Sequence, residues 1–139
     1  MLMVYKFGPA LGSPDLSPFV VKLETWLRMA QLPYDTRIVD SRKMPQNKLP
    51  AINDDGEVIV DSTQCIAYLK AKHGDCLNDA RLSPEQAAVA RAMHALLEKD
   101  FYFAAVVLRW ADDENFKVLG PVLADYGRSV GVPSFIAGF

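Results

Sequence analysis

The stretch SPFVVKLETWLR, residues 17–28, combines a helix start with a candidate reactive position. Ser17 precedes Pro18, which predicts a helix N-terminus, because an N-cap serine oxygen can accept from unpaired amides and a proline at the first helical position gives up no hydrogen bond. Apolar residues recur at helical spacing from Phe19 onward, so the helix is expected to run to about Gln31. The amides and the positive end of the helix dipole would also stabilise a thiolate or carboxylate at Ser17.

Short strands are predicted on both sides of this helix. Residues 2–7 alternate in character and are followed by the breakers Gly8 and Pro9. Residues 34–39 alternate in the same way after Pro33 has stopped the helix. The order is therefore strand, helix, strand.

A β-hairpin is predicted next. Its strands, residues 49–53 and 57–60, are joined by a DDG turn at 54–56, which is among the strongest short-range hairpin signals. The polar segment 40–48 that precedes it is too short for a full helix between two strands and is expected to hold one helical turn at most. After the hairpin, Asp61 and Ser62 are expected to cap a helix that ends near Gly74.

The polar connector 76–82 is expected to be a boundary between a sheet domain of residues 1–75 and a partial α-helical domain of residues 83–139. The second domain begins with a capping box at Ser83. Two neighbouring apolar stripes follow, a width that predicts burial on more than one side; they comprise Ala90, Met93, Leu97, Phe101, Ala104 and Leu108 and, beside them, Val89, Leu96, Phe103, Val107 and Trp110.

A weaker helical segment is expected over residues 116–128, interrupted by Gly120 and Pro121. Beyond Gly127 the sequence is apolar and glycine-spaced to Phe139, and we expect it to be a piece of a longer protein. The aromatic residues near 101–110 are expected to form interhelical core rather than an aromatic cage.

Composition excludes several classes of protein. Half of the 139 residues are hydrophobic and 23% are charged, which is typical of a globular chain. The net charge of −2 offers no basic field for nucleic acid. The longest apolar run, Phe101 to Leu108, is far below the ~20 residues of a transmembrane helix. The pair Cys65 and Cys76 suggests no secreted disulfide framework, so a cytoplasmic location is expected.

Metal binding is not predicted either. His73 and His94 lie far apart and form no ligand spacing with the two cysteines.

The order of elements favours an α/β fold of the thioredoxin-like kind, with a mixed four-stranded sheet, followed by an all-α domain. The motifs Ser17-Pro18-Phe19, Lys48-Leu49-Pro50 and Asp61-Ser62 resemble the N-terminal domain of cytosolic glutathione transferases. Within that superfamily the chain most resembles the metaxin and failed-axon-connections branch. The resemblance covers about residues 1–110.

The resemblance implies that Ser17 faces the sulfur of bound glutathione. Lowering a thiol pKa by about two units requires ~2.7 kcal/mol. A helix terminus supplies ~0.3–1 kcal/mol, or up to ~2 when partly buried, and a hydrogen bond to the charged sulfur adds ~1.5–3 kcal/mol. A serine hydroxyl can donate that bond. Two alternatives remain open: Ser17 is only a cap, or Tyr5 on the first strand is the active hydroxyl.

The other two motifs are expected to hold the rest of glutathione. By resemblance Pro50 is a cis-proline, and Leu49 offers its backbone N–H and C=O to the cysteinyl part. Ser62 would hold the γ-glutamyl carboxylate and Asp61 the amino group, although both residues could be caps alone. Lys48, or Lys43, would meet the glycyl carboxylate that a full second helix holds in the family.

Two functions follow from this reading. The first is a glutathione S-transferase-like protein, a homodimer that activates the glutathione thiol for transfer to an electrophilic small molecule. Its hydrophobic co-substrate would lie between the sheet domain and the long helix, near Arg91, His94 or Tyr102. The second is a non-catalytic metaxin-like adaptor that uses the same fold for protein-protein interaction, which the shortness of segment 40–48 favours.

Overall fold

The computed structural model describes residues 1–132 of the chain. Its first half is a four-stranded mixed sheet with the strand order β2-β1-β3-β4. Strand β1 (Leu2–Lys6) runs parallel to β2 (Asp35–Ile38) and antiparallel to β3 (Ala51–Asp54). Strand β3 forms the predicted hairpin with β4 (Glu57–Val60). This is the thioredoxin-like arrangement expected from the order of elements.

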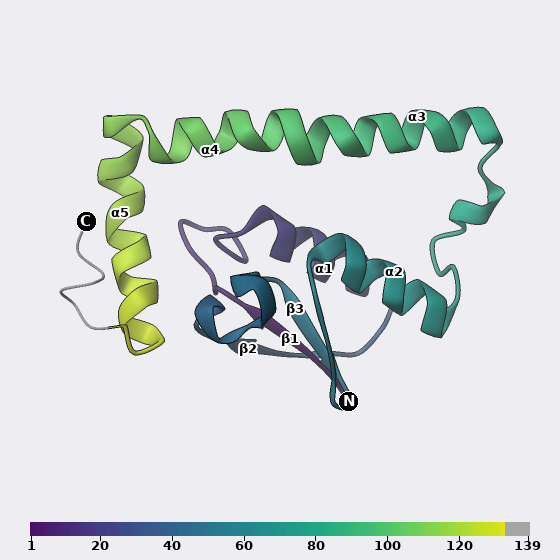
Figure 1. Ribbon diagram of the computed structural model, residues 1–139, viewed down its shortest axis with the longest axis horizontal. Helices are drawn as coiled ribbons and strands as arrows, with labels where there is room; N and C mark the ends of the chain where they lie inside the picture. The colour runs from purple at the N-terminus through teal and green to yellow at the C-terminus, as the bar shows by residue number, and fades with distance from the viewer. Residues whose placement is uncertain (133–139) are drawn as a thin grey trace.

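Two helices pack against the sheet, α1 (Pro18–Met29) and α2 (Ser62–His73). They lie between the strands and the long helical segment in the view of Figure 1. The core forms where side chains of strand and helix meet, and each of these is fully buried: Val4, Leu23, Leu27, Ile52 and Leu69. Alternate residues of β1 are buried, so one of its faces supports α1 and α2.

Segment 40–48 differs from the prediction of one turn at most. It contains two consecutive 3₁₀ turns, η1 (Ser41–Lys43) and η2 (Pro45–Asn47). The carboxylate of Asp40 accepts from the Arg42 amide at 3.0 Å and fixes the first turn. Gln46 and Asn47 within the second turn have left-handed backbone, so the helical path does not continue beyond it. No α-helix forms in this segment, as predicted.

The second half of the described chain is helical. After a connector with a 3₁₀ turn, η3 (Asp79–Arg81), the elements α3 (Pro84–Ala95), the π-helical η4 (Leu96–Phe101) and α4 (Tyr102–Trp110) run on as one long helix, and α5 (Asp113–Ser129) turns away from its end (Figure 1). The predicted capping box is present: Ser83 Oγ accepts from the Gln86 amide, and the Gln86 side chain accepts from the Ser83 amide at 2.9 Å.

The prediction that the long helix is buried on more than one side is wrong for the described chain. Phe101, Phe103 and Val107 remain 65%, 64% and 60% exposed. Phe101 lines the cleft on the side that faces the sheet half, whereas Phe103 and Val107 do not, and both stay exposed within residues 1–132. Helical periodicity locates an apolar face but does not say what covers it.

Helix α5 is also more regular than predicted. It continues through Pro121, where an interruption was expected. A proline inside a helix removes one backbone hydrogen bond without necessarily ending the helix. In the described residues no helix is both long and apolar enough to cross a membrane.

Candidate active site

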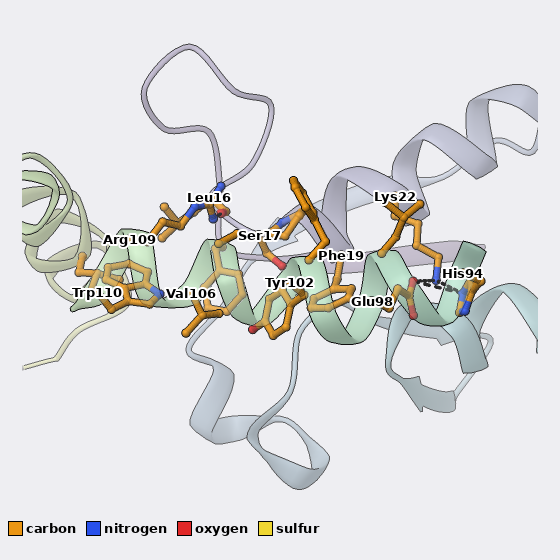
Figure 2. A pocket seen from close by; sticks show the side chains of 16 residues that line it. Leu16, Ser17, Phe19, Lys22, His94, Glu98, Tyr102, Val106, Arg109 and Trp110 are labelled. Atoms are coloured by element: carbon orange, nitrogen blue, oxygen red, sulfur yellow. Dashed lines mark hydrogen bonds and ion pairs between the residues drawn. The ribbon is translucent and has the colours of Figure 1, made fainter. Parts of the chain in front are cut away.

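A cleft of about 550 Å³ lies between the start of α1 and the long helix. Figure 2 shows the side chains that line it. They come from the two halves of the chain, and most are apolar or aromatic. From the sheet half come Phe7, Leu16, Ser17, Pro18, Phe19 and Lys22; from the helical half come His94, Leu97, Glu98, Phe101, Tyr102, Ala105, Val106, Arg109, Trp110 and Leu123. The cleft therefore exists only where the two halves meet.

Ser17 lines this cleft but does not cap α1 in the way predicted. It is the N-cap residue and Pro18 follows at the first helical position, yet the Ser17 side chain makes no capping hydrogen bond. Its own amide instead donates to Asp15 Oδ1 at 2.8 Å. Because the hydroxyl has no capping role, it can donate to a ligand in the cleft.

Asp15 is a buried carboxylate behind Ser17 that the sequence analysis missed. Its Oδ2 accepts from the Gly8 amide at 2.7 Å, so one side chain ties both ends of the loop from residue 8 to 17. Lys6 lies 3.8 Å away and pairs with Glu24 at 2.9 Å. Burial raises the pKa of Asp15, although its backbone hydrogen bonds act in the opposite direction. An acidic residue two positions before the Ser-Pro pair was the available signal.

The peptide bond between Leu49 and Pro50 is cis, as predicted. Leu49 is 8% exposed. Within residues 1–132 neither its N–H nor its C=O forms a hydrogen bond. The Pro50 carbonyl accepts from the Asp61 amide at 3.1 Å, so this turn is attached directly to the start of α2.

Asp61 and Ser62 occupy the predicted N-terminus of α2. The carboxylate of Asp61 accepts from the Thr63 and Gln64 amides at 2.9 and 3.4 Å, which confirms Asp61 as a cap. Ser62 is only 2% exposed. Neither residue is among those that line the cleft, and the same holds for Leu49 and Pro50.

The remaining candidates lie apart from the cleft. Lys48 and Lys43 are exposed on segment 40–48, Arg91 is exposed on α3, and Tyr5 lies half-buried on β1. Of the three residues expected near the co-substrate, Arg91, His94 or Tyr102, the last two do line the cleft. Of the three motifs, only the Ser17 segment reaches this cleft.

A polar cluster closes one end of the cleft. Lys22 on α1 pairs with Glu98 on η4, donates to Thr63 Oγ1 at 2.9 Å and lies 3.4 Å from His94 Nε2. His94 lies 3.3 Å from Glu98. These contacts connect α1, α2 and the long helix. Only the fold shows them, because Lys22 and Glu98 are 76 positions apart.

The opposite end of the cleft contains Leu16, Arg109 and Trp110, with Ser17 between the two ends (Figure 2). Tyr102 packs its ring against Phe19 at a centroid distance of 4.7 Å. Phe101, Tyr102 and Trp110 therefore line a cleft between the two halves, and the prediction that they form interhelical core is wrong. Arg109 donates to the Leu16 carbonyl at 3.4 Å.

Neither cysteine belongs to the described part of the cleft. Cys65 is buried in the core, and burial raises the pKa of its thiol to about 12. Cys76 is exposed in the connector, and both thiols are free. Neither lines the cleft, so the described part of the site has no thiol nucleophile of its own.

Comparison with known proteins agrees with this architecture. The family model described as "Glutathione S-transferase N-terminal domain" matches residues 18–115. The isoprene-epoxide--glutathione S-transferase of Rhodococcus sp. (strain AD45) is 38% identical over 129 residues, which are 88% of this chain and 54% of that protein. Failed axon connections of Drosophila melanogaster is 34% identical over 144 residues, which are 100% of this chain and 33% of that protein. The chain thus spans about half of the first relative's length and a third of the second's.

Solved structures show the same fold. A glutathione S-transferase from Rhodospirillum rubrum F11 superposes with a TM-score of 0.63 at 18% identity, over 92% of this chain and 64% of that one. Glutathione transferase Omega 3C from Trametes versicolor gives a TM-score of 0.62 at 17% identity, over 89% and 57% of the two chains.

Proposed function

This chain belongs to the glutathione S-transferase superfamily. We propose that the protein binds glutathione with the thiol next to Ser17 and that the glutathione thiol is transferred to an electrophile bound in the cleft. The observation that carries the proposal is the Ser17 hydroxyl, which lines the cleft and is not used as a helix cap. A hydroxyl in that position can donate to a thiolate.

The energetics of thiol activation are consistent with this role. A shift of about two pKa units requires ~2.7 kcal/mol. The N-terminus of α1 provides up to ~2 kcal/mol in a partly buried setting, and a hydrogen bond to a charged sulfur provides ~1.5–3 kcal/mol. Ser17 is half-buried at that terminus, so the two contributions together are sufficient.

The rest of glutathione is proposed to extend from Ser17 toward Leu49 and α2. The unpaired backbone groups of Leu49 suit the cysteinyl part of the tripeptide. The start of α2 provides Ser62 for the γ-glutamyl carboxylate, and it provides Asp61, which also caps the helix, for the amino group. Lys48 is placed near the glycyl carboxylate by resemblance. On this view residues 1–75 form the glutathione-binding domain and residues 83–139 belong to the domain that holds the co-substrate.

The electrophile is proposed to have an apolar body, because aromatic and aliphatic side chains make up most of the cleft. The name of the Rhodococcus relative makes an alkene epoxide the first class to test. In that reaction the thiolate forms a C–S bond at one epoxide carbon, the C–O bond at that carbon breaks, and the oxygen takes up a proton to become a hydroxyl. No oxidant or reductant is needed.

Steady-state conjugation assays test this proposal. The wild-type protein should conjugate chlorodinitrobenzene or an alkyl epoxide, and Ser17→Ala should lower kcat/KM by about tenfold or more, as expected for loss of a hydrogen bond to a charged atom. Thr25→Ala, which removes an exposed hydroxyl from the same helix, is the matched control. A loss of activity in Tyr5→Phe but not in Ser17→Ala would instead identify the strand tyrosine as the active hydroxyl.

A second candidate function is a non-catalytic adaptor, favoured by the similarity to failed axon connections and by the absence of an α-helix in segment 40–48. A stable protein complex that Ser17→Ala leaves intact, together with no glutathione affinity by calorimetry, would support it. For either function we infer a homodimer by resemblance, which sedimentation would test. The two free thiols support the proposal of a reducing, cytoplasmic compartment.

A further inference from the structure

Within residues 1–132, Arg109 is a cation without a counter-ion at the Trp110 end of the cleft. In the part of the chain that the structure describes it forms no ion pair, and its guanidinium makes one hydrogen bond, to the Leu16 carbonyl at 3.4 Å. Residues 133–139 contain no aspartate or glutamate, so they cannot supply a side-chain partner. A guanidinium has five N–H donors, and most of these are unused.

The rest of the cleft does not offer Arg109 an anion. Glu98 is the only carboxylate among its described lining residues, and it pairs with Lys22 at the opposite end (Figure 2). The neighbours of Arg109 along the cleft are apolar or aromatic, such as Val106 and Trp110. Arg109 is partly buried among them. A half-buried cation in such surroundings is stabilised when a ligand brings the missing negative charge.

We propose that Arg109 binds a carboxylate of the electrophilic co-substrate, so that the cleft selects an apolar or aromatic electrophile with one acidic group. This inference rests on the proposed function and specifies its substrate class. A carboxylate fits the planar guanidinium fork by two parallel hydrogen bonds. Ser17 lies between Arg109 and the Lys22 cluster, so a ligand held at Arg109 presents its other end toward the thiol position.

Glutathione also contains carboxylates, but its proposed path leads away from Arg109. That path runs from Ser17 to Leu49 and Ser62, and neither of the last two lines the cleft. Arg109 reaches the cleft from α4, a part of the helical half. The carboxylate at Arg109 is therefore assigned to the co-substrate.

Calorimetry with an unreactive pair of ligands tests the assignment without requiring turnover. Naphthoate and its uncharged amide are titrated into the full chain. The wild-type protein should bind the acid about tenfold more tightly than the amide, as expected for one charge-assisted contact. Arg109→Gln should abolish that preference, and Arg109→Lys should retain part of it because the charge remains without the fork. Arg91→Gln, an exposed arginine outside the cleft, should change nothing.

Equal affinity of the wild-type protein for acid and amide would overturn the assignment. So would a preference that survives in Arg109→Gln. A titration of glutathione itself distinguishes the two sources of carboxylate: if Arg109→Gln weakens glutathione by about tenfold and leaves naphthoate unchanged, Arg109 belongs to the glutathione site and the assignment fails. An Arg109-dependent acid preference without any conjugation would support the anion site and contradict the transferase proposal.

Discussion

Among the single residues of the site, Asp15 holds the backbone and Ser17 presents the hydroxyl. The carboxylate of Asp15 accepts from the amides of Gly8 and Ser17, which fixes the loop that delivers the chain to α1. The Ser17 side chain itself makes no capping hydrogen bond to α1. A loop that is held by a buried neighbour can place a reactive group without using that group as structure.

Asp15→Ala should lower the free energy of unfolding by about 2–4 kcal/mol, because it leaves two amide donors without their acceptor near the buried Lys6. Urea denaturation measures the change. The control is Asp35→Ala at an exposed position of β2, which should stay within about 0.5 kcal/mol of the wild type. An equally small effect in Asp15→Ala would show that the loop does not depend on this carboxylate.

Asp54 makes the free energy of unfolding depend on pH in the acid range. The hydrogen bond from Lys72 holds the pKa of Asp54 below its usual 3.8, with help from Tyr68. A lowered native pKa means that the unfolded chain binds the proton more readily. This stabilisation is therefore complete above about pH 5 and is lost as the pH falls through the unfolded and then the native pKa.

Asp54→Asn should therefore lower the free energy of unfolding by about 1 kcal/mol at neutral pH, and the difference from wild type should vanish in strong acid. Unfolding curves measured across the acid range provide the test. Asp113→Asn, an exposed aspartate of α5, serves as the control at each pH. A deficit in Asp54→Asn that stays constant from neutral pH into strong acid would contradict the assigned ionisation.

Among the elements, α5 contacts the sheet half through Tyr126. Tyr126 Oη donates to the Val39 carbonyl at 2.7 Å and accepts from the Ser41 amide at 3.2 Å. Its ring lies 5.1 Å from that of Phe7. The tyrosine thus joins α5 to the segment that runs from β2 into η1.

Tyr126→Phe keeps the ring contact and removes both hydrogen bonds, so it should cost about 1–2 kcal/mol of stability. It should also raise amide hydrogen exchange in α5 more than in α1. Tyr34→Phe removes a longer contact, 3.3 Å from Arg28 Nε, and should have little effect. Unchanged exchange in α5 would mean that other contacts of this helix hold it in place.

The sequence was informative wherever the signal is local. The DDG turn and the capping box at Ser83 each specify their structure within a few residues, and each is confirmed. The cis bond before Pro50 is also confirmed, but it was predicted from the family resemblance, because few X-Pro bonds are cis. Predictions that depend on packing were less successful. Pro121 did not interrupt α5, and the wide apolar stripe of the long helix is exposed in the described chain, because sequence periodicity does not show what lies opposite a helix.

In the whole molecule, the cleft depends on contacts that no motif contains. Ser17 and the Leu49-Pro50 pair could be found from contiguous motifs. Lys22 and Glu98 could not be paired from the sequence, because tertiary packing brings them together across 76 positions. Arg109 reaches Leu16 across 93 positions for the same reason.

The Lys22–Glu98 pair should couple the sheet half to the helical half by about 0.5–1 kcal/mol in a double-mutant cycle of Lys22→Met and Glu98→Gln. Both side chains are partly shielded, at 28% and 23% exposure, which should make this coupling larger than that of the exposed pair Lys117–Glu114 within α5. A coupling no larger than in the α5 pair would indicate that this contact contributes little to holding the halves together.

The proposed thiol activation has one direct observable, the pKa of glutathione when it is bound, followed by the ultraviolet absorbance of its thiolate as the pH is raised. The wild-type protein should lower that pKa by about two units. In Ser17→Ala the pKa of bound glutathione should be about one unit or more higher than in the wild type. Ser129→Ala, on α5 and not among the residues that line the cleft, should behave as the wild type. A bound thiol with the same pKa in the wild type and in Ser17→Ala would contradict the assignment of Ser17 as the group that activates glutathione.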